Sequence, residues 1–493
     1  MKAETHAATL RNSAENRPDI RRSASYSAAD TVPMTPRLTN ALLSAALSCA
    51  ALAAPAAAQC VDEDALEPVA PQAQNSTPVA SMAPVEPRSA LAGLVRDALE
   101  RSHAVGAARL MAEAALQDIE EARAAKSIQA SVGAGIGPGG SRSAAVTETA
   151  TLQLRANVNI SQLLYDGGRS DRLVDWRTQL AESARWGQLS QQEQLALTAV
   201  ALQLERSRNR MTAQVWRNHV RKTGCLVEAL ETIVRTDRGR ASELVQAQKT
   251  LQQAELQLVQ TQSAVRQIEV RLRRLVGDGL PGTEGLSTVF MGVPELPQLV
   301  ADVERSTEIA QLEAQEKASR RYAEAVAAGG KPQVSWNVSG SVAAGNNSGS
   351  AGGNGGPTRN GSYSLGLAVS LPLLSPGVEP ATGAARKRAE AARLQRAEAL
   401  ESRRFRVAEV HEQATAALDR ARRLAEVLKN SEQVRSFTLQ QWQQLGRRSL
   451  FDVMAAEADH YNMRVAYVNA LHDVQQLNAN LLTLGRGVVD WLR

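Results

Sequence analysis

Residues 244–275 have the sequence LVQAQKTLQQAELQLVQTQSAVRQIEVRLRRL. Apolar and small residues recur in this stretch at alternating spacings of three and four, which is the heptad pattern of helices that pack along a seam. The seam positions are Leu244, Ala247, Leu251, Ala254, Leu258, Thr261, Val265, Ile268, Leu272 and Leu275. We therefore predict a long packed helix of about four heptads.

The same pattern occurs a second time, 209 positions later. Its positions are Val453, Ala456, His460, Met463, Tyr467, Ala470, Val474, Leu477, Leu481 and Leu484. Two other segments agree at an offset of 210, since Gln162-Leu163-Leu164 and Gly167 match Pro372-Leu373-Leu374 and Gly377. A repeat with this period indicates a tandem duplication.

Each repeat also contains two stretches in which apolar and polar residues alternate. Alternation with a period of two is typical of strands that have one apolar and one polar face. The apolar set of the first repeat is Ile128, Ala130, Val132, Ala134, Ile136, Ala150, Leu152, Leu154, Ala156, Val158 and Ile160. That of the second is Val334, Trp336, Val338, Val342, Tyr363, Leu365, Leu367, Val369 and Leu371. We predict β-hairpins at 127–163 and 332–373, with turns near 138–143 and 345–361.

Helices are expected elsewhere, because proline is absent between Pro138 and Pro281 and again after Pro380. We predict helices at about 89–125, 170–276 and 296–327, with the second one broken near Gly224 and at residues 237–239. The first repeat then covers 89–277, a linker 278–295, the second repeat 296–485 and a C-terminal tail 486–493.

The composition fits this reading. The chain has 493 residues, of which 43% are hydrophobic but only 3% aromatic, and its formal net charge is +5. Few aromatic and many small residues suit long packed helices. Because the basic residues are interspersed with acidic ones, we interpret them as solvated helix faces and predict no nucleic-acid partner. The three cysteines form no CxxC pair and the histidines no cluster, so we predict no metal site, no cofactor and no disulfide framework.

The N-terminal region has the layout of an export signal. An apolar run at 41–54 follows Arg37 and precedes Ala56-Ala57-Ala58, which predicts a signal peptide at 1–58 and a mature start at Gln59. The run is too short to be favoured as a membrane anchor. Residues 1–33 are polar, so Met34 is a possible true start. Lipidation at Cys49 or Cys60 stays open, although neither has the usual leucine before it. Residues 59–88 read as a Pro/Ala-rich periplasmic arm.

The hairpins raise the question of what covers their apolar face. No second sheet is predicted, so lipid is the available cover. Four strands cannot enclose a lumen, because the smallest membrane barrels have about eight. Several copies would be required, and the helices attached to the strands would then continue the barrel as a tube.

At this point the residues resemble the TolC family of outer-membrane factors. The resemblance lies in the strand-to-helix segment 159–169 (NISQLLYDGGR) and in the helix-tip segments 239–244 (GRASEL) and 446–453 (GRRSLFDV). It implies an α+β membrane protein: a homotrimer with four transmembrane strands per protomer, a 12-stranded barrel and a periplasmic α-helical tunnel. The implied partners are outer-membrane lipid, a periplasmic adaptor and an inner-membrane ABC transporter that exports a protein toxin or adhesin, as in the CyaE-like type I secretion branch. An RND pump for drug efflux is the alternative.

The family's functional residues carry over by motif. At the periplasmic gate, Arg448 is the linking cation, Ser242 and Glu243 are its candidate partners, and Asp452 points toward the aperture. Ala455 stands where a second carboxylate can occur, so a weaker cation block is expected. The strand-to-helix motif comprises Gln162, Tyr165, Asp166, Gly167, Gly168, Pro372 and Gly377.

Other classes fit less well. Gly133, Gly135 and Gly137 precede a strand rather than a phosphate-binding helix, so a dinucleotide enzyme is disfavoured. His411-Glu412 lacks the second histidine of a zinc protease. A nucleic-acid-binding coiled coil would need neither a signal peptide nor amphipathic hairpins. A periplasmic adaptor or scaffold remains the alternative from another class, and fractionation of the outer membrane distinguishes it.

Overall fold

The computed structural model describes residues 86–139, 151–346, 357–445 and 447–493. All of them belong to the second of the two units into which the chain divides, residues 62–493. The predicted signal peptide, nearly all of the predicted arm and the tips of both predicted hairpin turns lie outside the described residues.

The described elements occur in two similar series. The first comprises α1 (Pro87–Arg101), α2 (His103–Ala124), β1 (Gln129–Gly139), β2 (Thr151–Tyr165), α3 (Arg169–Thr236), the 3-10 turn η2 (Arg238–Arg240) and α4 (Ala241–Val276). The second comprises the 3-10 turn η3 (Leu286–Thr288), α5 (Leu296–Val303), α6 (Thr307–Ala328), β3 (Gln333–Asn346), β4 (Pro357–Ser370), α7 (Val378–Leu445), α8 (Leu450–Leu484) and α9 (Val488–Leu492).

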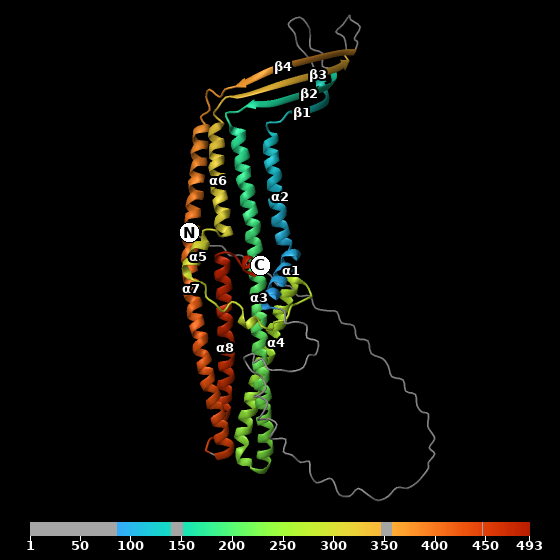
Figure 1. The fold of residues 1–493 in the computed structure, drawn as a ribbon. Coiled ribbons are helices and arrows are strands. Elements are labelled where there is room, and N and C mark those ends of the chain that lie inside the picture. Colours follow the sequence, from blue (N-terminus) through green and yellow to red (C-terminus); the bar gives the residue numbers. More distant parts are fainter. Residues whose placement is uncertain (1–85, 140–150, 347–356, 446) are drawn as a thin grey trace, which may run out of the picture. The chain divides into compact units, whose positions relative to one another are not determined.

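Two long helices, α3 and α7, contact one set of helices near the sheet and another set away from it (Figure 1). The helices α3 and α7 each have 68 residues, or about 100 Å at 1.5 Å per residue. On the side of the sheet, α3 packs against α2 and α6, and α6 packs against α7. On the other side, α3 packs against α4 and α8, and α7 packs against α8.

The heptad seams face these helix contacts. Ala247, Ala254, Ile268 and Leu272 of α4 are buried, and none of the ten seam positions in either helix is exposed. At the far end, Leu230 of α3 joins residues of α4, α7 and α8 in one apolar cluster. The predicted seams are therefore confirmed as packing surfaces.

A belt of short elements surrounds the middle of the helices. One buried cluster contains Leu91 of α1, Val200 of α3, Val488 of α9 and, from the segment after η3, Phe290. Nδ2 of the Asn478 side chain donates to the backbone carbonyl of Phe290 over 2.6 Å. Residues 278–295 and 486–493, expected as a linker and a tail, thus contribute core side chains.

Three helix boundaries differ from the predictions. The helix expected at 89–125 is split at Ser102, whose hydroxyl accepts from the amide of Val105 and caps α2. The helix expected at 296–327 is split between α5 and α6, after Val303. The break expected near Gly224 is absent within α3, because one glycine costs only about 1 kcal/mol in a helix that packs along its length.

Among the described residues, the sheet has four antiparallel strands in the order β1-β2-β3-β4. The strands extend further toward the turns than predicted, since Pro138 still pairs with Leu152 and Asn346 with Pro357. The register shifts between Leu163 and Tyr165, where β2 bulges before it enters α3.

Candidate functional site

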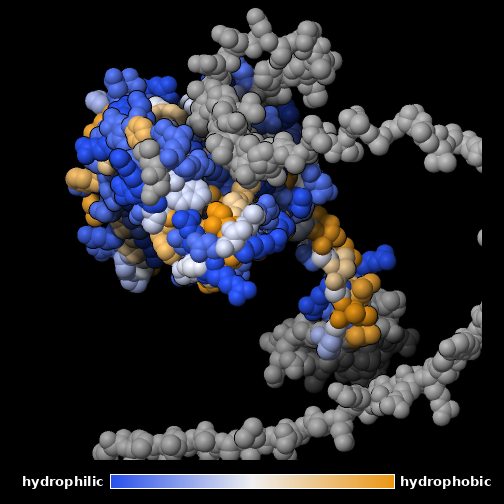
Figure 2. Space-filling view, turned by 90° about the horizontal axis from the view of Figure 1, so that it is seen from below, coloured by the Kyte–Doolittle hydropathy of each residue, from blue (hydrophilic) through white to orange (hydrophobic). Residues whose placement is uncertain are grey.

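The first candidate surface is the apolar face of the sheet. The register aligns residues of all four strands in rows, such as Ala130, Ile160, Val338 and Leu365. The strands thereby combine their separate apolar sets into one continuous surface, and hydrophobic side chains gather on the projecting sheet in Figure 2. The large members that are exposed are Val132, Ile136, Leu152, Leu154, Val158, Val342, Tyr363, Leu365, Leu367 and Val369.

This exposure is extensive. Val132 is 77% exposed, Leu365 76% and Tyr363 93%. Removing one large apolar side chain from water contributes about 1.5–3 kcal/mol, so the face loses this contribution many times over unless something apolar covers it. An exposed apolar surface of this extent marks a contact with lipid or with another protein.

The opposite face is polar and built from small residues. One of its rows is Ser131, Asn159, Ser339 and Ser364. The hydroxyls of Ser339 and Ser364 lie 2.7 Å apart, so neighbouring strands also bond through side chains. The chemistry of this face suits contact with water rather than with lipid.

A polar pair closes the apolar face where the strands meet the helices. The indole Nε1 of Trp336 donates to Oε1 of Gln162 over 3.1 Å, and Nε2 of Gln162 donates to the carbonyl of Lys126 over 3.2 Å. Tyr165 lies nearby at the end of β2 and is 54% exposed. Aromatic side chains with polar tips are typical of the boundary between lipid and water.

The residues after β2 form a tight turn into α3. Gly167 and Gly168 have φ angles of +68° and +83°, which glycine adopts without strain. The carboxylate of Asp166 accepts from the amides of Gly168 (3.1 Å) and Ser170 (2.6 Å). Burial alone would raise the pKa of Asp166, but hydrogen bonds from Ser170 and the charge of Lys126 lower it below its ordinary value.

The second repeat leaves its sheet differently. Pro372 follows β4, and the amide of Val378 donates to the carbonyl of Ser375 over 3.0 Å. Gly377 accepts from the amide of Ala381 and has no positive φ angle. The departure of this segment from the first copy in sequence is therefore matched by a different turn.

The predicted gate residues lie at the opposite end of the helices. Asp237 accepts from the amide of Gly239 over 3.0 Å and orders the turn between α3 and α4. Ser242 is exposed on the first turn of α4, and Glu243 beside it is half-buried. Asp452 and Ser449 form a capping box at the start of α8, in which the amide of Ser449 donates to Oδ2 of Asp452 over 3.1 Å.

Within the described protomer the predicted gate link is not formed. Nε of Arg448 donates to Oε1 of Gln441 over 3.2 Å, rather than to Ser242 or Glu243. The structure therefore brings Asp452 to a cap and Arg448 to its own hairpin. Contacts of these side chains with another protomer stay a prediction.

Several charged residues are buried between helices, where we predicted solvated faces. Arg206 of α3 and Glu269 of α4 are only 5% and 15% exposed, and Nε of Arg206 lies 3.0 Å from the carboxylate. Burial would raise the pKa of Glu269, but Arg206 and Arg210 lower it below its ordinary value. Arg206 also donates to the carbonyl of Pro281 over 2.7 Å and so holds the linker.

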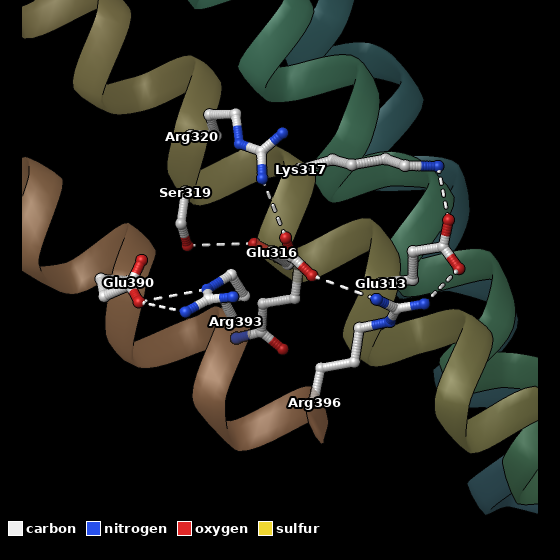
Figure 3. Close-up of polar contacts among 9 residues, drawn as sticks. Glu313, Glu316, Lys317, Ser319, Arg320, Glu390, Arg393 and Arg396 are labelled. Atoms are coloured by element: carbon white, nitrogen blue, oxygen red, sulfur yellow. Dashed lines mark hydrogen bonds and ion pairs between the residues drawn. The ribbon is translucent and has the colours of Figure 1, made fainter. Parts of the chain in front are cut away.

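A second polar group joins α6 and α7. Figure 3 shows Arg396 reaching from α7 toward Glu313 and Glu316 of α6. Its guanidinium nitrogens lie 3.4 Å and 3.6 Å from these carboxylates, and Glu316 is only 11% exposed. Lys317 and Arg320 pair with the same two carboxylates from within α6.

Buried histidines form a third polar group. His219 of α3 is 3% exposed and packs against Tyr461 of α8, with 4.6 Å between ring centroids. Nε2 of His460 lies 3.0 Å from Oε2 of Glu432 of α7. Burial, followed by the charge of His460, lowers the pKa of His219 to about 4. The position of His460 within the seam was the one sequence signal for this group.

Two negative findings concern the described ranges alone. None of their helices is long and apolar enough to cross a membrane. Within the same ranges, no three His, Cys, Asp or Glu side chains are grouped so that they could hold a metal ion.

We compared the sequence and the structure with known proteins. Residues 301–485 match the family model described as outer membrane efflux protein. No curated protein sequence matches the chain. Among solved structures, CusC is similar over 85% of this chain and 99% of its own, with a TM-score of 0.71 and 16% identity.

Two other outer-membrane proteins share the fold. VceC from Vibrio cholerae has a TM-score of 0.65 and 18% identity over 80% of this chain and 96% of its own. The open state of the MtrE channel from Neisseria gonorrhoeae has a TM-score of 0.64 and 16% identity over 80% of this chain and 88% of its own. The described unit therefore has the fold of TolC-like outer-membrane channels.

Proposed function

We propose that this chain is the protomer of an outer-membrane export channel, a passive duct without catalytic activity. The continuous apolar face of the sheet carries the proposal, because lipid is the cover that such a face requires on a closed ring of strands. The match of residues 301–485 to outer membrane efflux proteins and the shared channel fold support it.

The channel is a homotrimer. In the described residues β1 and β4 are edge strands, each with one neighbour in the sheet. Pairing of β1 with β4 of the next copy satisfies both edges, and three copies give a 12-stranded barrel, above the minimum of about eight. The long helices extend from the barrel into the periplasm as a tunnel.

We place the hairpin loops outside the cell. β1 starts directly after α2 and β4 ends directly before α7, so the opposite strand ends, at Gly139, Thr151, Asn346 and Pro357, lie away from these helices. An epitope inserted after Gly353 is expected to be labelled on intact cells. Labelling only after permeabilisation would contradict this orientation and indicate the opposite one.

The partners are a periplasmic adaptor and an inner-membrane transporter. The segment 159–169, with its ordered Asp166-Gly167-Gly168 turn, supports type I secretion of a toxin or adhesin with an ABC transporter. The description of the matching family supports small-molecule efflux with an RND pump as the second candidate. Deleting the chain would abolish export of the cognate protein in the first case and lower resistance to toxic compounds in the second.

The gate lies at the periplasmic helix tips. Arg448 links to Ser242 and Glu243 of a neighbouring hairpin in the closed trimer, and Asp452 contributes negative charge to the aperture. A single exposed link contributes only about 0–1 kcal/mol, so closure depends on several links repeated by symmetry.

Fractionation and conductance test the function together. The mature protein is expected in the outer membrane as a crosslinkable trimer, and the purified trimer is expected to give discrete conductance steps in planar bilayers. A soluble periplasmic product without conductance would instead support an adaptor or scaffold.

A further inference from the structure

The polar face of the sheet is almost free of charge. Among the described strand residues, only Arg155 and Arg359 carry a formal charge at neutral pH. The register places them on opposite faces. Arg155 aligns with Gly135 and Ala343, between the polar rows, whereas Arg359 pairs with Ala344 on the apolar side.

Among the described residues, the guanidinium of Arg155 is held in place by a neutral partner, Gln153. Its Nε and Nη2 donate to Oε1 of Gln153 over 3.2 Å and 2.9 Å. An amide oxygen orients the group but leaves its positive charge intact. The described strands contain no Asp or Glu that could compensate this charge.

The neighbouring strands leave this charge open to the face. Gly135 has no side chain and Ala343 has only a methyl group, so neither covers the guanidinium, and Arg155 is exposed. On a wall of Ser, Asn and Gly residues, one such cation dominates the local potential. Its effect extends over a Debye length of about 10 Å at 0.1 M salt.

We propose that Arg155 sets the ion preference of the barrel lumen and makes the sheet-lined part of the channel favour anionic solutes. This inference rests on the proposed function, which turns the polar face toward the lumen and brings three copies of Arg155 into one ring. Rings of Arg or Lys are a recognised means of favouring anions in pores.

The reversal potential in a KCl gradient measures this preference. In R155Q channels the ratio of chloride to potassium permeability is expected to fall roughly twofold at 0.1 M salt, with a smaller change at 1 M where screening is stronger. R155K is expected to retain the wild-type ratio. R359Q removes the same charge from the other face of the sheet and is the matched control, with no change expected.

A second variant keeps the arginine. Q153E places a carboxylate beside the guanidinium and is expected to lower the ratio like R155Q, so the test also stands if R155Q fails to assemble. If wild-type channels conduct but R155Q and Q153E channels keep the wild-type ratio, the role of Arg155 is refuted. If the wild-type trimer gives no conductance at all, the proposed function itself is refuted.

Discussion

Single residues determine how the sheet joins α3. Gly167 combines a φ angle of +68° with a close approach to Lys331, and an added Cβ would lie 2.4 Å from Cβ of that lysine. Nζ of Lys331 also donates to the carbonyl of Gly167 over 3.1 Å. The turn therefore has neither the conformation nor the space for a side chain.

Gly167→Ala is expected to destabilise the protein by about 1–3 kcal/mol, the usual cost of a strained backbone position. The measurement is the midpoint of thermal unfolding in detergent, together with the yield of trimer. Gly377→Ala is the matched control, because Gly377 occupies the corresponding position of the second repeat and has open space around it. Equal losses in both variants would contradict the assigned role.

The sequence predicted these residues by motif, but not all of their roles. The paired glycines of the first copy indicated a special turn, and positive φ angles are found there. Asp452 was expected at an aperture, and its carboxylate caps α8 within the protomer. Ser449 and Asp452, three residues apart at the start of a helical pattern, are themselves the sequence signal of a capping box.

At the scale of elements, α6 and α7 are joined by a cation that neither helix pattern reveals. Arg396→Met keeps the aliphatic stem but leaves Glu316 with only Arg320 among its ion-pair partners. We expect a loss of about 1–2 kcal/mol, between the values for exposed and buried pairs. Chemical denaturation measures it.

The control for this change is Arg393→Met. The partner of Arg393 is Glu390, three residues away on the same exposed surface of α7. Losing that exposed pair is expected to cost less stability than losing the contact of Arg396. If both variants lose the same stability, the contact between helices contributes nothing specific.

Charged residues at the helix tips are expected to control the opening of the gate. Arg448→Ser together with Glu243→Ala is expected to raise single-channel conductance, because fewer links hold the tips together. Asp452→Ala is expected to weaken block by multivalent cations, and Ser449→Ala separates the two roles of the carboxylate, since it breaks the same capping box without removing the charge. Unchanged conductance in a correctly assembled double variant would reject the gate.

The contact between α3 and α8 predicts a dependence on pH. His219 has a pKa of about 4 in the folded state and about 6.5 when unfolded, so the unfolded chain binds more protons between these values. The contribution of His219 to the free energy of unfolding is therefore fully present above about pH 6.5 and is lost as the pH falls toward 4. Besides His460 and Tyr461 of α8, Glu432 and Arg435 of α7 belong to the same polar group.

We expect the free energy of unfolding of the wild-type protein to fall by about 2 kcal/mol per protomer between pH 7 and pH 5 because of the titration of His219. His219→Phe keeps the ring contact and removes the titration, so its stability is expected to depend less on pH. His103→Phe alters an exposed histidine and serves as the control. The comparison uses thermal unfolding followed by circular dichroism, and parallel pH profiles of all three proteins would contradict the assignment.

Whole-element predictions from the sequence succeeded where a periodic pattern repeats. The seams at 244–275 and 453–484 show which face of each helix packs, and the alternating strands show which face of the sheet is apolar, so these helices and hairpins were predictable. The break at Ser102 and the buried pair of Arg206 with Glu269 were not. The ion pair joins residues 63 positions apart, and charges at helical spacing look the same whether they face water or another helix. Ser102 caps α2 through Val105, only three residues on, but the helical pattern on both sides of it does not mark the break.

At the scale of the whole molecule, the two similar series of elements explain how one chain builds both a four-stranded sheet and long packed helices. Each repeat contributes two strands to one sheet, and the register between β2 and β3 joins the repeats into a single apolar face. One repeat alone would leave a two-stranded hairpin, which is marginally stable in water. Joining the repeats therefore stabilises the sheet and makes its apolar face continuous.

We propose that lipid covers one face of this sheet and water the other. Neighbouring residues of one strand test it, because Val132 and Ser131 of β1, like Leu365 and Ser364 of β4, point to opposite faces. Each is changed to cysteine in a chain whose native cysteines are serine, labelled with an environment-sensitive fluorophore, and reconstituted into lipid vesicles. We predict that quenchers attached to lipid chains act on probes at 132 and 365, and aqueous iodide on probes at 131 and 364. Equal quenching of all four probes by iodide would contradict the claim that this sheet lies in the membrane.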